Sequence, residues 1–379
     1  MSGFLKAIAA ITPTTPQPLA REYDGLEFKW KMFVFRPAAF KFEAMMLGIL
    51  GAYLLLHLIG KHFNMTRAKT TLAPYIPILQ NQFTKVTPLQ SSSSALHLVY
   101  ATGRRNVLAA HVTLKLKPFH DFIQMLLTFA DAFIDPLSDS SESMVFQFTL
   151  GRGTSGFQGE GAGVWAIVNK DGMAKFRKNR FDLTFARLHE STAMPATHAL
   201  FSEHSDITDA ILKTPNVGVT EVLADPTAAR ILKGLIITDA PAKRPQNGPL
   251  KPEQRAREIY LSVHRPTSQD EADAVNAWIQ VALNLADLVT RPNLLKPEVA
   301  RKLVRTRQEL DVSLAKQFKK EQEEDNPPEQ TAEEKRAARK RAERSKMSEK
   351  DQKRAEELDR KREMRKMQKR GGGDELLMG

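Results

Sequence analysis

A glycine-rich segment in the middle of the chain has the spacing of a dinucleotide-binding fingerprint. Gly151-Arg152-Gly153-Thr154-Ser155-Gly156 follows a strand-like run, and Asp171 lies twenty residues after Gly151. Such a site needs a helix that begins directly after the glycines, because the free amides of its first turn bind the pyrophosphate. Here the chain continues through further glycines into a second strand-like run at Val164. The segment is therefore predicted to be a surface loop that binds no nucleotide.

No other pattern in the sequence predicts catalysis or metal binding. The chain has no cysteine, which excludes disulfides, thiolate nucleophiles and cysteine-based zinc sites. The nine histidines are scattered, and His198 and His204 near Glu203 lack the spacing of a zinc-binding helix. No GxSxG nucleophile elbow is present. We therefore predict that the protein is not an enzyme and holds no cofactor or metal.

Basic side chains gather near the C-terminus. Residues 331–370 hold 17 Lys+Arg and 9 Asp+Glu, a net +8 out of the +12 of the whole chain. Such an arm favours a polyanion and would contact phosphates without reading base sequence. No aromatic residues interleave, so stacking on single-stranded bases is not expected. The residues predicted to bind RNA or the ribosome are Lys335, Arg336, Arg339, Lys340, Arg341, Lys361, Arg362, Arg365, Lys366, Lys369 and Arg370.

Two helices are predicted to present these cations. Pro297 suits the first position of a helix, and Asn326-Pro327-Pro328 would end it. A second helix is expected from Thr331, which has the glutamate of a capping box three residues later. Residues 297–370 are thus predicted to form a charged helical hairpin or coiled coil, followed by a disordered tail, 371–379. The alternative is a solvated charged helix without a partner, because its apolar residues are sparse for a coiled-coil seam.

One segment near the N-terminus is long and apolar enough to cross a bilayer. Ala44–Gly60 contains no formal charge and would span about 25 Å as a helix, near the lower limit for a hydrocarbon core of about 30 Å. Aromatic and cationic residues alternate before it, as is typical of a membrane interface. We predict a transmembrane helix at 43–61, preceded by a short segment and interfacial collar, 1–42. A buried core helix is the alternative, which His57 favours slightly.

The orientation of this span is predicted from two arguments that disagree. Residues 21–43 hold five Lys/Arg and residues 61–80 hold three, which would place the N-terminus in the cytosol. The large, charged C-terminal part has no features of a luminal protein, and its lack of cysteine fits a reducing compartment. We give the second argument more weight and predict a luminal N-terminus with a cytosolic C-terminal domain.

Residues 70–292 combine strand and helix patterns in an irregular order, which predicts one α+β domain. Gly103-Arg104-Arg105-Asn106 has the composition of a hairpin turn. Helices are predicted where apolar residues recur at helical spacing, at 119–133, 206–212 and 271–290. Strands are predicted at 95–101, 107–117, 144–150, 164–168, 181–188, 231–237 and 259–263.

The order of these parts resembles the calumin family, the coiled-coil endoplasmic reticulum membrane proteins that form the larger subunit of the PAT intramembrane chaperone complex. Each motif is short, and the resemblance rests on their order from residue 28 onward. The matching motifs are Trp30-Lys31-x-Phe33, Ile59-Gly60-Lys61, Phe83-Thr84-x-Val86, Gly103-Arg104, Pro136-x-Ser138-Asp139, Glu334-Lys335-Arg336-Ala337 and Ser348-Glu349-Lys350-Asp351.

The resemblance implies a non-enzymatic role in the biogenesis of multi-pass membrane proteins at the endoplasmic reticulum. The implied partners are the translating ribosome with its ribosomal RNA, the Sec translocon, a small Asterix-type membrane protein, nascent multi-pass membrane proteins and the lipid bilayer. Longer family members carry a signal peptide and an acidic luminal segment linked with calcium, whereas this chain is nearly free of acids before Glu22. This difference argues against a calcium role, which is kept only within the alternative: an endoplasmic reticulum membrane protein of calcium homeostasis or quality control without ribosome contact.

Overall fold

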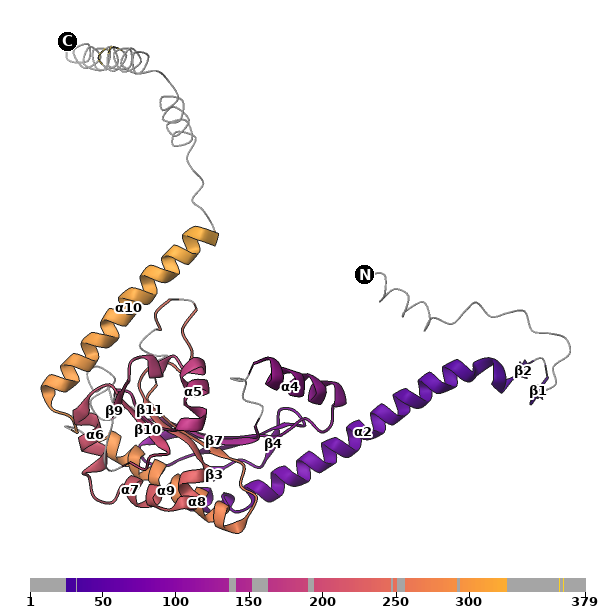
Figure 1. Cartoon of the computed structure of the whole chain (residues 1–379), viewed down its shortest axis with the longest axis horizontal. Coiled ribbons are helices and arrows are strands. Elements are labelled where there is room, and N and C mark those ends of the chain that lie inside the picture. The colour runs from indigo at the N-terminus through magenta and orange to yellow at the C-terminus, as the bar shows by residue number, and fades with distance from the viewer. Residues whose placement is uncertain are drawn as a thin grey trace, which may run out of the picture. The chain divides into compact units, whose positions relative to one another are not determined.

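The computed structural model describes residues 25–31, 33–135, 141–151, 163–189, 194–246, 248–250, 256–291 and 294–325, together with residues 361 and 364 (Figure 1). The chain divides into two compact units, Met1–Ser313 and Leu314–Gly379. The first unit contains an apolar helix and a mixed helix and sheet domain. In the second unit the described residues are the end of helix α10 (Pro297–Asp325), Lys361 and Met364.

An antiparallel sheet forms the centre of the first unit. Its strand order is β3-β5-β6-β7-β12-β11-β8-β10-β9, and β4 pairs with β5 away from this path. Sequence neighbours therefore pair at one end, whereas β12 and β11 are inserted between β7 and β8. The strands are β3 (Lys85–Val86), β4 (Gln90–Ser91), β5 (Leu96–Thr102), β6 (Val107–Lys115), β7 (Ser143–Leu150), β8 (Trp165–Asn169), β9 (Arg187–His189), β10 (His198–Ser202), β11 (Leu232–Thr238) and β12 (Glu258–His264).

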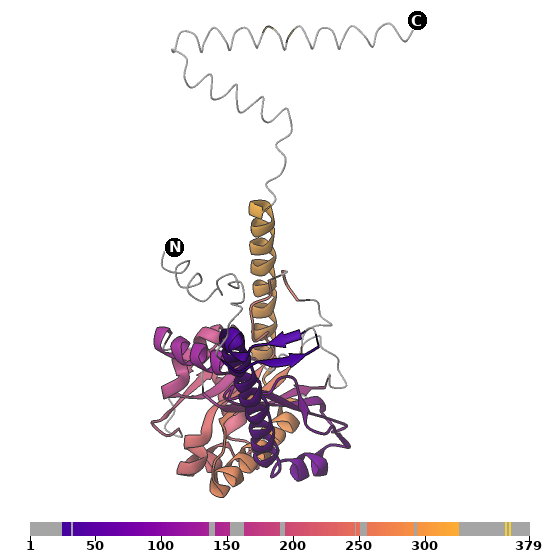
Figure 2. The same cartoon turned by 90° about the vertical axis from the view of Figure 1, so that its right-hand side faces the viewer.

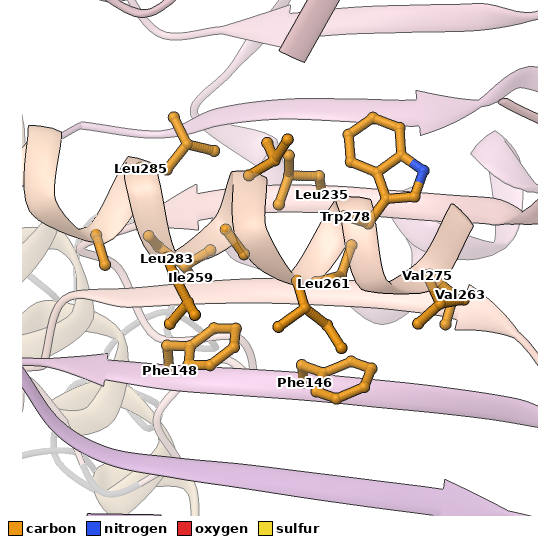
Figure 3. Packing of buried hydrophobic residues seen from close by; sticks show 14 of the residues in the cluster. Phe146, Phe148, Leu235, Ile259, Leu261, Val263, Val275, Trp278, Leu283 and Leu285 are labelled. Carbon is orange, nitrogen blue, oxygen red and sulfur yellow. The ribbon is translucent and has the colours of Figure 1, made fainter. Parts of the chain in front are cut away.

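One face of the sheet carries the larger core. Helix α9 (Gln269–Val289) packs its buried side against β7, β11 and β12, where Phe146, Phe148 and Leu261 meet Trp278 and its neighbours (Figure 3). Helices α7 (Val219–Ala224) and α8 (Pro226–Ile231) lie beside α9. The indole nitrogen of Trp278 donates to the carbonyl of Ala228 at 2.9 Å, so the largest side chain of α9 is buried with its polar atom satisfied.

The opposite face has a smaller core. Val164, Ala166 and Val168 from β8 and its approach pack there with Phe201 of β10. Helix α5 (Met173–Asn179) covers this face and contributes Met173 and Phe176. In Figure 1, α5 and helix α4 (Phe122–Ile134) lie on the other side of the sheet from α7, α8 and α9.

Most elements predicted from apolar spacing are confirmed, with ends shifted by one to three residues. The turn Gly103–Asn106 joins β5 to β6, and its end residues have φ of +93° and +68°, which glycine and asparagine tolerate best. The helices predicted at 206–212 and 271–290 correspond to α6 (Ser205–Leu212) and α9. Helix α10 begins at Pro297 as predicted. Of the second helix of the predicted hairpin, Lys361 and Met364 are described and are helical; the rest lies outside the described residues.

The strand predicted at 181–188 is wrong in its first half. Residues Asp182–Thr184 form a short 3₁₀ helix, and only Arg187–His189 form a strand, β9. The buried carboxylate of Asp182 accepts from the Arg180 guanidinium at 3.0 and 2.6 Å and from the Leu183 amide at 3.0 Å. These bonds hold the chain in a turn where apolar content alone favours a strand.

Candidate membrane-facing surface

The predicted span is the first half of a longer helix, α2 (Lys41–Leu72). It is the one helix among the described residues that is long and apolar enough to cross a membrane. None of its most apolar stretch is buried against the protein, so the alternative of a buried core helix is wrong. Its large exposed side chains are Met45, Met46, Leu47, Ile49, Leu50, Leu54, Leu55, Leu56, Leu58 and Ile59.

A small hairpin precedes this helix and carries aromatic and basic side chains. Strands β1 (Phe28–Trp30) and β2 (Phe33–Phe35) pair antiparallel, and Lys31 in their turn has a φ of 56°. Trp30 is 76% exposed. The carboxylate of Glu27 bonds both Arg36 and Lys29, and these bonds lower its pKa although burial opposes them. Exposed aromatics beside paired charges are typical of the boundary between a membrane and water.

The second half of α2 belongs to the folded domain. Its buried residues, Gly60, Asn64, Ala68 and Thr71 with Leu72, recur every three or four positions and therefore share one face. Ala68 and Leu72 join the larger core. The same helix thus leaves the domain core and continues as an exposed apolar rod (Figures 1 and 2).

Gly60 lies where the segment before α4 crosses α2. A Cβ atom at this position would lie 2.3 Å from the carbonyl oxygen of Phe119 and 2.6 Å from the Cα of His120. One turn later the side-chain amide of Asn64 donates to the carbonyl of Lys117 at 2.9 Å. The crossing segment therefore lies against the backbone of α2, and only glycine permits this distance.

A shared carboxylate joins this crossing to the sheet. Glu142 lies just before β7 and accepts from Arg67 of α2 and from Arg265, which follows β12, each at 2.7 Å. It also accepts from the backbone amide of Lys117 at 3.1 Å. Burial tends to raise the pKa of Glu142, but the two arginines and the amide outweigh it and lower the pKa below its usual value. The Arg67 guanidinium also lies about 5.4 Å from the ring centroid of Phe119.

Helix α4 leaves this crossing with none of its residues buried. Asp121 caps its first turn by accepting from the amides of Ile123 and Gln124. The predicted helix is confirmed, but its apolar residues face outward instead of covering the sheet. The large exposed ones are Phe122, Ile123, Leu126, Leu127, Phe129, Phe133 and Ile134.

A buried charge cluster holds the first part of α10 to the domain. The Arg307 guanidinium binds Glu203 at 2.6 Å and Asp239 at 2.7 Å, and all three side chains are at most 12% exposed. Burial raises the pKa of Glu203, while Arg307 opposes the rise. Burial disfavours the charged form of Arg307, but the two carboxylates raise its pKa. Leu303 packs nearby against Gly163, whose φ is +68°. The sequence did not predict this cluster, because its members are far apart in the chain.

The structure shows where the glycine-rich segment and the histidines considered as candidate sites lie. Gly151 directly follows β7, and residues 152–162 lie outside the described residues, but the chain re-enters a strand, β8, at Trp165. His198 is buried in β10, which lowers its pKa, and Glu203 binds Arg307. Within the described ranges, no group of three or more His, Asp and Glu could hold a metal ion.

The basic residues predicted to bind RNA fall almost wholly outside the described residues. Lys361 is the exception and is helical and exposed. The role of the arm therefore stays a prediction from sequence.

Comparison with known proteins matches most of the chain. The model of a family described as PAT complex subunit CCDC47 matches residues 39–366. The chain is also similar to a UPF0674 endoplasmic reticulum membrane protein of Schizosaccharomyces pombe. The two are 27% identical over 354 residues, which cover 87% of each chain. The family match includes α2, the ten-stranded sheet, α10 and most of the basic arm, whereas the hairpin of β1 and β2 lies before it.

Proposed function

This chain belongs to the family of the PAT complex subunit CCDC47, and from that premise we propose that it is a non-enzymatic chaperone-complex subunit of the endoplasmic reticulum membrane. In this role it assists the biogenesis of multi-pass membrane proteins. It binds translating ribosomes and the Sec translocon and pairs with a small Asterix-type membrane protein. The similarity to a yeast endoplasmic reticulum membrane protein supports the location.

The observation that carries the proposal is the division of α2 into an exposed apolar half and a buried half. An exposed run of leucines is costly in water and favourable in lipid. The buried half shares its core with the sheet, and Gly60, Asn64 and Arg67 hold it there. A helix built in this way joins a membrane anchor to a folded domain without a flexible linker. Such a rigid connection suits a subunit that positions other components at a membrane.

The proposed topology places residues 1–42 in the lumen and residues 62–379 in the cytosol. A glycosylation acceptor inserted with a spacer between Thr12 and Pro18 should therefore receive sugar in microsomes. An acceptor inserted near Lys213, on the exposed surface after α6, should stay unmodified. The reverse pattern of modification would show that the proposed orientation is inverted.

Ribosome binding is assigned to the basic arm, 331–370. Its net charge of +8 supports contact with RNA phosphates.

Co-sedimentation of the detergent-solubilised full chain with ribosomes at graded salt tests this assignment. Six phosphate contacts would lower affinity on the order of a thousandfold between about 50 and 200 mM salt. Replacing Lys335, Arg336, Arg339, Lys340 and Arg341 by glutamine keeps good helix formers but should weaken binding and flatten the salt dependence. The matched control changes Arg336, Arg339 and Arg341 to lysine, which keeps the charge and should keep binding.

Two outcomes would overturn the assignment. If the glutamine variant and a truncation at Glu329 both bind with the affinity and salt dependence of the wild type, the arm is not the contact. If the wild type itself does not sediment with ribosomes at low salt, the alternative role without ribosome contact, in calcium homeostasis or quality control, replaces this one.

A further inference from the structure

Helix α4 has its amphipathic faces reversed relative to a helix of a water-soluble domain. Gln124, Thr128 and Asp131 recur at spacings of four and three and form one narrow polar stripe. Large apolar side chains occupy the opposite, wider face, and they are 56–82% exposed. The half-buried residues of α4 are Met125, Thr128, Ala130 and Ala132. A surface helix in water normally directs its apolar face to the core; α4 directs it outward.

The contact with α2 sets the level of α4 relative to a membrane. Gly60 is the last residue of the uncharged run, and it touches the backbone of Phe119 and His120. Helix α4 begins only two residues later, at Phe122. If the uncharged run lies in the hydrocarbon, α4 therefore begins at the boundary between hydrocarbon and headgroups. Figures 1 and 2 both show α4 beside α2.

The length of α4 and the charges near its ends suit an interfacial helix. Thirteen residues span about 20 Å, too short to cross a hydrocarbon core of about 30 Å. Lys61 and Lys117 are exposed on the two segments that cross at Gly60, where they can meet lipid phosphates. At the other end, Lys178 of α5 binds Asp135 at 2.8 Å and ties α4 to the domain.

We propose that α4 lies in the membrane interface, with its wide apolar face in the lipid and its polar stripe at headgroup level. The proposal rests on α2 spanning the membrane. A single span leaves a domain free to rotate about the helix axis. A second contact beside it fixes which side of the domain faces the bilayer.

Site-specific labelling of the full chain in lipid nanodiscs tests this proposal, and the absence of native cysteine makes single-cysteine variants free of background. An environment-sensitive fluorophore is attached at Phe129→Cys on the apolar face and at Gln124→Cys on the polar stripe. Leu54→Cys reports the span, and Lys213→Cys reports a site in water. Nanodiscs with and without lipids that carry a shallow nitroxide quencher are compared, together with quenching by aqueous iodide.

The label at Phe129→Cys should emit at shorter wavelength than that at Gln124→Cys, lose emission to the nitroxide lipids and resist iodide. If it resists iodide but is not quenched by the nitroxide lipids, a protein surface covers α4 and the proposal is wrong. Strong quenching by iodide would place α4 in water and also overturn it. Strong quenching by iodide at Leu54→Cys would instead refute the membrane anchor, so failure of the two proposals can be told apart.

Discussion

Replacing Gly60 by alanine should separate α2 from the domain more than any other single methyl addition in this helix. The added Cβ would lie 2.3 Å from the carbonyl oxygen of Phe119 and 2.6 Å from two further backbone atoms, the Cα of His120 and the carbonyl carbon of Phe119. Because these are main-chain atoms, no rotamer change can relieve the overlap. The crossing segment must move by about an ångström to restore ordinary contact.

The expected loss of unfolding free energy follows from the contacts that this movement disturbs. Overpacking of this kind costs about 1–3 kcal/mol. Moving the segment also weakens the bond from Asn64 to the Lys117 carbonyl, and a buried amide without its partner costs about 1–3 kcal/mol. Alanine returns about 1 kcal/mol through its higher helix propensity. The net loss of unfolding free energy is therefore about 1–5 kcal/mol. At the middle of that range, about 3 kcal/mol, Tm falls by about 6–12 °C for a large domain.

Gly48 and Gly51 provide matched controls in the same helix. Neither has an atom within 4 Å of the position of an added Cβ, so Gly48→Ala and Gly51→Ala should leave Tm unchanged or raise it slightly. Thermal unfolding of the detergent-solubilised full chain, followed by intrinsic tryptophan fluorescence, measures all three variants. Phe119→Ala should not rescue Gly60→Ala, because the clash is with backbone. If Gly60→Ala unfolds at the temperature of Gly48→Ala, the close crossing deduced here is wrong.

Three further predictions concern the charge cluster, a buried histidine and the span. Arg307→Gln should lower the free energy of unfolding by about 3–5 kcal/mol, because it leaves two buried carboxylates without a cation. Glu203→Gln should cost clearly less, since Arg307 keeps Asp239 as a partner. Equal losses of Tm in the two variants would contradict the cluster. Burial lowers the pKa of His97 below 6.5, so folding favours its neutral form. The contribution of His97 to stability should therefore be complete above pH 6.5 and fall as the pH drops toward the folded-state pKa. His97→Gln should show a smaller acid-induced fall in Tm than the wild type, and an identical fall would refute this. The wild type should stay in the membrane pellet after alkaline carbonate extraction, and arginine at both Leu54 and Leu55 should release it, since each charge costs roughly 2.5–3.5 kcal/mol at the centre of a span.

Local sequence patterns were enough to predict the elements whose side chains meet the same kind of environment along their whole length. In strands β6 and β7, buried apolar residues alternate with less buried residues that point to the opposite face of the sheet. Helix α9 carries a continuous apolar stripe. The uncharged run Ala44–Gly60 likewise identifies the candidate span. In the strands and in α9, burial on one side imposes a period, and in the candidate span an apolar environment all around imposes an uncharged run; both patterns can be recognised without knowledge of any neighbour.

Elements governed by contacts between distant segments could not be predicted in the same way. Strand β10 was missed because its apolar run has only three residues, Ala199–Phe201, between the buried polar residues His198 and Ser202. The turn at Asp182 depends on a charge pair whose burial comes only from packing. The direction in which α4 presents its apolar face was also hidden, because periodicity shows that a helix has two faces and not which one meets the protein.

The residues that hold α2 to the domain show most clearly what the sequence determines and what only the tertiary structure decides. The sequence alone determined that an uncharged candidate span ends at Gly60 and that cations gather at 331–370, since both are properties of composition along the chain. Only the tertiary structure decided that Gly60 touches the backbone of Phe119, that Arg67 shares Glu142 with Arg265, and that α2 continues into the core. These contacts join residues about 60 to 200 positions apart, and their energies depend on distances that composition does not contain.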